Sequence, residues 1–170
     1  PSCALPYLAL GYCFELMADH AKAIEACEKA IHLNPNDSAA YAQLAHSLNF
    51  NGESQEALGP MERALRLNPK PPYFFYMYEG AIYYHLKRYK EALSALKKAL
   101  NLAPNAIMIH LRLAACYISL GLEEEARKEV EEVLHLNPKF SLAYVPKSLP
   151  LKDKAELDLF INSLRRAGLN

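Results

Sequence analysis

The residues of this sequence that could do chemistry are aromatic rings with a few hydrogen-bonding tips, and they gather in one stretch. Eight of the seventeen Phe and Tyr residues lie between Tyr73 and Tyr89. At helical spacing, Tyr76, Gly80 and Tyr83 form one stripe of this stretch. A second, displaced stripe is formed by Phe74, Met77, Tyr78, Ala81, Tyr84 and His85. A helix that is apolar on two sides packs on both, or packs on one and offers the other to a partner, so we expect recognition chemistry here.

Residues for catalysis, cofactors or metals do not form a recognisable pattern. The sequence has no nucleophile elbow, phosphate-binding loop or paired carboxylates, and its six His residues lack metal-ligand spacing. The four cysteines are Cys3, Cys13, Cys27 and Cys116. They have no C-x-x-C spacing and three lie within helical patterns, so we expect buried free thiols in a reducing compartment. We predict a chain without enzymatic activity, cofactor or metal.

Composition argues against two further classes of protein. The chain has 19 acidic and 19 basic residues, whereas a nucleic-acid binder usually has a basic surplus. Its hydrophobic content of 52% is ample for a folded core. No apolar run approaches about 18 residues, so we expect no membrane span. We also expect the protein to be cytoplasmic. Because the sequence begins at Pro1 without an initiator Met, we expect a fragment of a longer protein.

The elements that position these residues are marked by a repeated tripeptide. A Leu–Asn/Ala–Pro tripeptide recurs at intervals of 34, 35 and 34 residues. Its copies are Leu33-Asn34-Pro35, Leu67-Asn68-Pro69, Leu102-Ala103-Pro104 and Leu136-Asn137-Pro138. Proline cannot continue a helix and pushes the preceding residue out of the helical region, so each copy should follow a helix end. Self-similarity at this period predicts a solenoid of helix pairs.

Small residues and turn signals recur at fixed positions within each period. We expect the small residues to let paired helices approach closely; they are Gly11, Ala45, Gly80 and Ala114 on the first helices and Ala23, Ala57, Ala92 and Ala126 on the second. The two helices of a pair should be separated at Asp19-His20, Asn51-Gly52, Lys87-Arg88 and Gly121-Leu122. Gly59-Pro60 should lie within the second helix of the second period and bend it.

This pattern resembles the tetratricopeptide repeat, with large–Leu–Gly/Ala–large on one helix and Ala–large–Ala on the next, closed by Pro. The resemblance places repeats at about residues 4–37, 38–72, 73–106 and 107–138, in a repeat region that we assign to 1–138. It implies an all-α, right-handed superhelix of four helix-turn-helix repeats in a single solenoid domain. Residues 139–170 would supply a short connector and a C-terminal capping helix.

The C-terminal segment carries a helix signal and a second resemblance. Asp153 can cap the free N–H groups of a helix over 153–167 while Glu156 reaches back, and a solenoid needs such a cap over its open end. Residues 140–142, 150–157 and 164–169 are similar to the tails of repeat regions in bacterial class III adenylate/guanylate cyclase proteins. That resemblance implies a regulatory or scaffold part of a bacterial signalling protein, with any cyclase activity in an absent N-terminal domain.

The tetratricopeptide resemblance implies a concave groove lined by the first helices. Its binding residues here would be Tyr12, Gln43, His46, Asn49, Phe50, Phe74, Met77, Tyr78, Tyr84, His85 and Arg112. Rings supply contact area at low entropic cost and polar tips fix register, so the surface suits a peptide or an amphipathic helix. We predict a protein–protein interaction module. Some members of this family bind the terminal carboxylate of a peptide through cationic side chains. We do not expect this binding mode here, because the matching positions carry no cation.

Alternative readings remain open at this point. In one alternative, the chain is a homo-oligomerisation domain that forms, for example, a homodimer through its groove or its repeat edges. In another, the C-terminal helix of the chain fills the groove. RNA binding by a related helical repeat is disfavoured by neutral charge and the mixed 34/35 spacing. Glu79 stands where an apolar residue is expected, and it would either pair with His110 or Arg112 or reach water at the edge of the helix.

Overall fold

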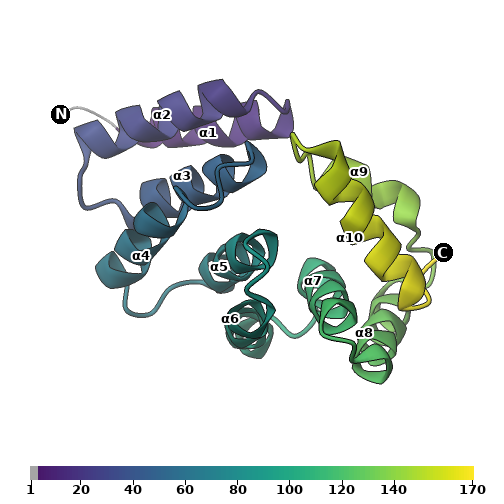
Figure 1. The fold of residues 1–170 in the computed structure, drawn as a ribbon. Coiled ribbons are helices and arrows are strands. Elements are labelled where there is room, and N and C mark those ends of the chain that lie inside the picture. Colours follow the sequence, from purple (N-terminus) through teal and green to yellow (C-terminus); the bar gives the residue numbers. More distant parts are fainter. Residues whose placement is uncertain (1–3) are drawn as a thin grey trace. The chain divides into compact units, whose positions relative to one another are not determined.

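All regular structure in residues 4–170, the part of the chain that the computed structural model describes, is helical. The elements are α1 (Leu5–Leu16), α2 (His20–Leu33), α3 (Ser38–Phe50), α4 (Leu58–Leu67), α5 (Tyr73–His85), α6 (Tyr89–Leu102), α7 (Ile107–Ser119), α8 (Glu123–Leu136), the 3-10 turn η1 (Leu142–Tyr144), α9 (Val145–Ser148) and α10 (Lys154–Arg166). Figure 1 shows α1 to α8 as consecutive helix pairs, which confirms the all-α prediction. None of these helices has the length and apolar character that crossing a bilayer requires.

The repeated tripeptide ends the second helix of each pair, as predicted. α2, α4, α6 and α8 all stop at the Leu of their tripeptide. The next residue has a φ between −128° and −144°, which is extended rather than helical. Proline lacks a backbone donor and excludes the helical conformation at the residue before it, so the helix cannot continue. Each tripeptide therefore fixes where the next first helix can begin.

A residue in the left-handed conformation joins the two helices of each pair. Ala18, Gly52, Lys87 and Gly121 have φ values of 57°, 90°, 59° and 76°. Glycine adopts this conformation without Cβ strain, whereas Ala18 and Lys87 adopt it at a cost. The same turn therefore recurs in every pair, although its sequence differs.

Gly11 and Gly80 lie where paired helices cross closely. A Cβ added at Gly11 would lie 2.9 Å from Cys27 Sγ, and one at Gly80 would lie 2.6 Å from Leu96 Cγ. Ala23, Ala92 and Ala126 on the second helices are fully buried, and so is Ala57, which directly precedes α4. The prediction that small residues permit close approach of the paired helices is confirmed.

α4 departs from the prediction at Gly59-Pro60. The other second helices have 14 residues, whereas α4 has 10 and begins at Leu58. Residues 54–57 form turns instead of helix. Pro60 therefore lies in the first turn of α4, where its missing N–H needs no helical partner and its ring meets no preceding turn. The expected bend within a full-length helix was wrong: the helix starts late.

The helices form two compact units, which we describe separately. Unit 1 runs to Pro71 and also includes Pro150–Lys152. Within it α2 packs against α3, and α1 also contacts α3. The Lys152 N–H donates to the Phe50 carbonyl at 3.0 Å, and Lys152 Nζ donates to Asn51 Oδ1 at 3.0 Å. A segment more than 100 residues downstream thus completes the end of α3.

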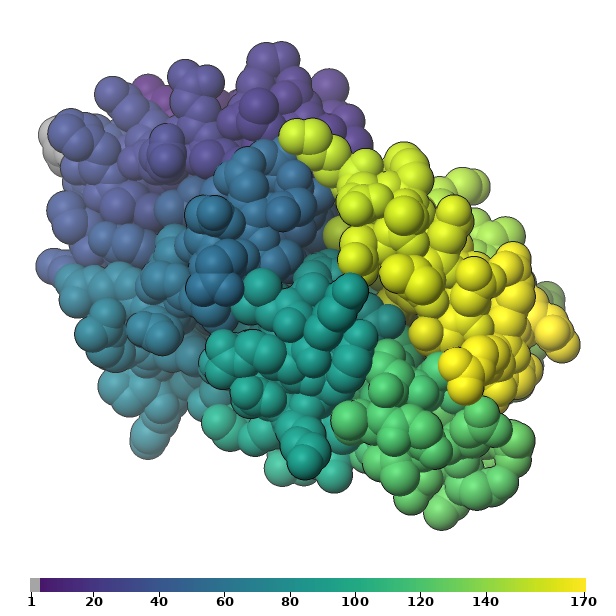
Figure 2. All heavy atoms as spheres, in the orientation of Figure 1, coloured from purple at the N-terminus to yellow at the C-terminus, as the bar shows by residue number. Residues whose placement is uncertain are grey.

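Unit 2 comprises Pro72–Leu149 and Asp153–Asn170. Within it α6 packs against α7, and α10 also contacts α7. Figure 2 shows the yellow C-terminal residues against the green residues of this unit. Asp153 caps α10 by accepting the N–H groups of Ala155 and Glu156 at 2.8 and 3.4 Å. The predicted C-terminal helix is present, and it buries an apolar stripe made of Leu157, Phe160, Ile161 and Leu164.

The cysteine prediction is confirmed for two residues and wrong for one. Cys27 and Cys116 are free and buried, and burial raises the pKa of each thiol to about 12. Cys13 is free but exposed, because it points away from the face of α1 that packs. Cys3 lies outside the described residues.

Candidate functional site

The first helices of unit 1 bring three polar side chains together around Glu15. Glu15 lies in the last turn of α1 and is 8% exposed. Its Oε2 accepts from Gln43 Nε2 at 2.7 Å and from Ser47 Oγ at 3.0 Å, and its Oε1 lies 3.0 Å from His46 Nδ1. Gln43, His46 and Ser47 share one face of α3 through their i, i+3 and i+4 spacing. The cluster therefore ties α1 to α3 through a buried carboxylate.

The charge of Glu15 is set by two opposing effects. Burial raises its pKa, but the neighbouring His46 and the hydrogen bonds from His46 and Ser47 together lower it by more, so the pKa lies below its usual value. The donors thus compensate for the desolvation of the carboxylate. The adjacent His20 has a lowered pKa, chiefly because of burial, and its ring is hydrogen-bonded to the Pro150 carbonyl.

Five residues of the predicted binding surface belong to unit 1, and the structure buries four of them. The buried four are Gln43, His46, Asn49 and Phe50. His46 lies on Phe50 with ring centroids 4.1 Å apart, and Asn49 Oδ1 accepts from Ser54 Oγ at 2.8 Å. Tyr12 is 37% exposed. The polar tips that the sequence assigned to a ligand are therefore used largely within the unit.

The other six belong to unit 2, where Tyr78, Tyr84 and Arg112 form a buried floor. Arg112 is 4% exposed, and its Nε has no hydrogen-bond partner among the described residues. Burial lowers the pKa of Arg112 to about 10, against the opposing influence of Cys116, Tyr78 and Tyr84. The guanidinium therefore keeps its charge at neutral pH although it is buried.

Tyr84 is covered by α10. Its ring centroid lies 6.0 Å from that of Phe160 in an edge-to-face arrangement. Its hydroxyl is hydrogen-bonded to Ser163 and Ser119, and burial raises the pKa of Tyr84 to about 12. At this position the C-terminal helix fills the surface of its own unit, which was one of the alternatives that the sequence left open.

Phe74, Met77 and His85 remain half-buried on α5. The Phe74 ring centroid lies 5.1 Å from that of Phe75 and 5.6 Å from that of Tyr78. Phe75 is 1% exposed, so it anchors the helix while Phe74 lies on the accessible side of the same ring cluster. The second predicted stripe is therefore only partly accessible: Phe74, Met77 and His85 are half-buried, whereas Tyr78, Ala81 and Tyr84 are buried.

Glu79 does not pair with His110 or Arg112, so that prediction was wrong. His110 instead contacts Glu129 Oε2 through Nδ1 at 2.6 Å and the Pro104 carbonyl through Nε2 at 2.8 Å. Glu79 is half-buried, and burial raises its pKa against the opposing charge of Lys98. It reaches a shallow hollow between α5 and α6, because its side chain lies on the other side of α5 from Arg112.

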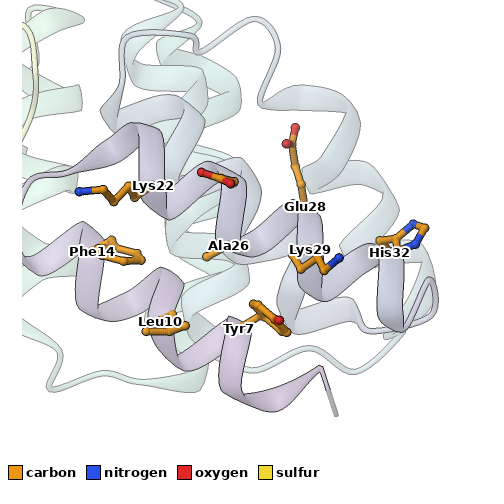
Figure 3. A pocket seen from close by; sticks show the side chains of 9 residues that line it. Tyr7, Leu10, Phe14, Lys22, Ala26, Glu28, Lys29 and His32 are labelled. Carbon is orange, nitrogen blue, oxygen red and sulfur yellow. The ribbon is translucent and has the colours of Figure 1, made fainter. Parts of the chain in front are cut away.

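A larger hollow in unit 1, which sequence reasoning missed, lies along α1 and α2. Its volume is about 690 Å³, and it is lined by Tyr7, Leu10, Phe14, Lys22, Glu25, Ala26, Glu28, Lys29 and His32. Figure 3 shows Tyr7, Leu10 and Phe14 along one helix and Ala26 facing them from the other. Leu10 is 44% exposed. The sequence pattern marks Leu10 as a packing position, and its exposure depends on which elements surround it in space.

Among residues 4–170, no group of three or more His, Cys, Asp or Glu side chains is placed to hold a metal ion. The buried carboxylate of Glu15 is engaged by three donors, and the accessible surfaces consist of rings, aliphatic side chains and exposed charges.

Three family models match the chain, and each is described as a tetratricopeptide repeat. They match residues 4–37, 26–59 and 83–144. Together they cover more than half of the chain, including the regions of α1 to α3 and of α6 to α8.

Curated relatives match over parts of the chain. The cell division cycle protein 27 homolog of Caenorhabditis elegans is 36% identical over 100 residues, which are 58% of this chain and 12% of that protein. The peroxisomal targeting signal receptor of Saccharomyces cerevisiae is 39% identical over 62 residues, which are 36% of this chain and 10% of that protein. The chain thus spans about a tenth of the length of these two relatives.

A solved structure shows the same fold. The crystal structure of the APC/C hetero-tetramer Cut9-Hcn1 matches with a TM-score of 0.78 and 23% identity, covering 97% of this chain and 30% of that one. Helix pairs closed by proline, the small residues at their crossings and the three family matches agree with one another. The chain belongs to the tetratricopeptide-repeat family.

Proposed function

We propose that this chain is a scaffold-type protein-interaction module that binds a peptide or a partner helix against the first helices of its repeats. The observation that carries the proposal is the half-buried surface of α5, where Phe74, Met77 and His85 lie beside a buried ring cluster. Solenoids of repeats use such extended surfaces for binding. We keep repeats at 4–37, 38–72, 73–106 and 107–138 as the units that build it.

Phe74 and Met77 have apolar surface left to bury. Fully burying a Phe or Met side chain is worth about 1.5–3 kcal/mol, so two half-buried ones offer a substantial share of the energy of a weak complex. Phe75 fixes the backbone beneath them, which reduces the ordering cost of binding. The thioether of Met77 can adapt to different apolar partners.

The buried members of the predicted surface would act as its floor. Tyr78, Tyr84 and Arg112 hold α5, α7 and α10 in place, whereas His85 on α5 remains half-buried, with a polar ring that could fix the register of the ligand. In this proposal the ligand contacts fewer residues than the sequence predicted. The Saccharomyces cerevisiae relative is a targeting signal receptor by name, which supports a binding role for the shared repeat.

Selection from a random peptide library displayed on phage would test the proposal. Peptides enriched on the wild-type chain should carry apolar or aromatic residues that fit beside Phe74 and Met77. Replacing both, as Phe74→Ser with Met77→Ser, should weaken binding of an enriched peptide by roughly tenfold to a hundredfold, because central apolar contacts carry most of the binding energy. Fluorescence polarisation with the labelled peptide measures the Kd.

A matched control separates this surface from other exposed apolar residues. Leu159→Ser removes a side chain on α10 that is 56% exposed, and it should leave the Kd unchanged. An unchanged Kd in the double α5 variant, with its helicity intact by circular dichroism, would contradict the assignment to α5.

The expected bacterial signalling context is narrower than this proposal. We propose a bacterial signalling context because the C-terminal segment is similar to the tails of repeat regions that accompany nucleotide cyclases. Any cyclase activity would then belong to a domain outside these 170 residues. Reading the gene upstream of the codon for Pro1 would test it. A cyclase domain there would support the context, and an unrelated sequence would end it.

A further inference from the structure

His110 on α7 stands at a position where the other three repeats carry tyrosine. Counted back from the closing proline of each repeat, it corresponds to Tyr7, Tyr41 and Tyr76. His110 is 5% exposed, so its ring must find its hydrogen-bond partners inside unit 2. Unlike tyrosine, an imidazole at this place can gain or lose a charge near neutral pH.

Both ring nitrogens of His110 face oxygen acceptors. Nδ1 lies 2.6 Å from Glu129 Oε2 on α8, and Nε2 lies 2.8 Å from the carbonyl oxygen of Pro104 in the turn before α7. A neutral imidazole has only one N–H, whereas an imidazolium donates from both nitrogens. An ionised carboxylate and a carbonyl cannot donate in return. The two contacts are therefore satisfied together only when the ring is a cation.

The groups around His110 favour this cation. The hydrogen bond to Glu129 raises the pKa of His110 most strongly, and burial opposes it. The bond to the Pro104 carbonyl and the charges of Glu129 and Glu132 raise this pKa further. The ring therefore holds its second proton more firmly than a histidine in water does.

Charged side chains on the other helices packed against α7 act elsewhere. α5, α6 and α10 all contact α7. Their charged groups lie in the pairs Glu79 with Lys98, Lys97 with the Tyr117 ring, and Arg166 with Glu123. None of these groups is among the main influences on the pKa of His110. Protonation of the ring is therefore governed chiefly by its contacts with α8 and with the preceding turn.

The turn before α7 cannot be capped in the way that the turn before α3 is. There, Asp37 Oδ1 accepts from the N–H groups of Ala39 and Ala40 at 3.0 and 3.3 Å. Ala106 occupies the same place before α7 and has no polar side chain. His110, in the first turn of α7, instead reaches back to the carbonyl of this turn. Its ring thereby links the turn to α8.

Loss of one proton would release one of these two contacts. A hydrogen bond to a carboxylate is charge-assisted and stronger than one to a neutral carbonyl, so the neutral ring would keep its proton on Nδ1. Nε2 would then turn a lone pair toward the Pro104 oxygen. We propose that His110 is a pH-sensitive clasp, which fixes the turn at residues 103–106 to α8 as a cation and releases this turn when the ring becomes neutral.

The clasp is independent of peptide binding on α5, and the sign of its pH dependence follows from linkage. The folded pKa of His110 lies above the ordinary value of 6.5. The stabilisation that the clasp supplies is therefore complete below pH 6.5 and is lost as the pH rises through the folded pKa. Alkaline conditions should loosen the junction between the third and fourth repeats.

Nitrogen NMR of the histidine rings tests the protonation state in the wild-type chain, with His110→Tyr identifying the His110 signals by their loss. At pH 6 both His110 nitrogens should carry protons, and at higher pH the proton should remain on Nδ1. In Glu129→Gln the amide can donate to Nδ1 of a neutral ring, so His110 should lose its charge at a lower pH. A ring that is already neutral at pH 6, or an unchanged titration in Glu129→Gln, overturns the proposal.

Hydrogen exchange tests the release of the turn. Corrected for intrinsic rates, the protection of amides in residues 103–110 should fall about tenfold between pH 6 and pH 8.5 in the wild type, as expected for one pKa unit. The fall should be absent in Glu129→Gln, whose amide satisfies the neutral ring. Glu125→Gln, at an exposed position of the same helix, should behave as the wild type does. Constant protection in the wild type, or an equal fall in Glu129→Gln, overturns the clasp.

Discussion

Glu15 shows how a residue assigned to a ligand face can serve the fold. Its carboxylate is buried and accepts from Gln43 and Ser47 with His46 beside it. The sequence predicted that Gln43 and His46 lie on a first-helix face. It could not predict their partner, because Gln43 and Glu15 are 28 residues apart and their distance depends on how α1 and α3 pack. An acidic residue at a position that faces another helix was the available signal.

Glu15→Gln should destabilise the chain by about 1–3 kcal/mol at neutral pH, because a buried ionic acceptor is replaced by a neutral amide. The effect should depend on pH. The folded pKa of Glu15 lies below 4.5, so its stabilisation is present above pH 4.5 and is lost as the pH falls through the folded pKa. Urea unfolding at pH 7 and pH 3 measures this.

The control for this prediction is Glu131→Gln, at an exposed position. It should follow the wild type at both pH values. Equal losses of stability on acidification in the wild type and in Glu15→Gln would show that Glu15 does not carry the expected linkage.

At the scale of elements, the left-handed turn is the feature that recurs most faithfully. Lys87 is exposed and has a φ of 59°, whereas Gly121 fills the equivalent position with a φ of 76°. Lys87→Gly should stabilise the chain by about 0.5–1 kcal/mol, because relief of left-handed strain exceeds the extra entropy of glycine in the unfolded chain. Gly121→Ala should cost about 1 kcal/mol for the converse reason.

Thermal unfolding of the two variants gives a test with opposite signs. A Cβ at Gly121 meets no atom within 4 Å, so backbone conformation alone should decide the result. A lower Tm for Lys87→Gly, or no change for Gly121→Ala, would contradict this account of the turn.

Helix ends could be predicted where a single residue fixes the backbone conformation at its own position. They were harder to predict where the sequence allows more than one local structure. Proline and the residue before it fix the ends of α2, α4, α6 and α8 through their own backbone geometry. The late start of α4 was misjudged, because Pro60 is compatible either with a kink or with the first turn of a shorter helix. The turns at residues 54–57 are the outcome that avoids a broken helix.

At the scale of the whole molecule, the period of the sequence predicted helix pairs and their order along the chain. It did not predict which faces stay accessible. Two distant segments decide that: α10 covers Tyr84 in unit 2, and Pro150–Lys152 completes α3 in unit 1. Their contacts join residues far apart in sequence, so a repeat pattern carries no information about them.

The most direct test of the interaction role follows the methyl signals of the four Met residues by NMR while a selected peptide is added. Met77 lies on the proposed surface of α5, whereas Met17 is exposed after α1 and Met61 is buried in α4. We predict that the Met77 signal shifts as the peptide binds while those of Met17 and Met61 stay in place. Saturable binding that moves Met17 or Met61 and leaves Met77 unchanged would contradict the proposed surface.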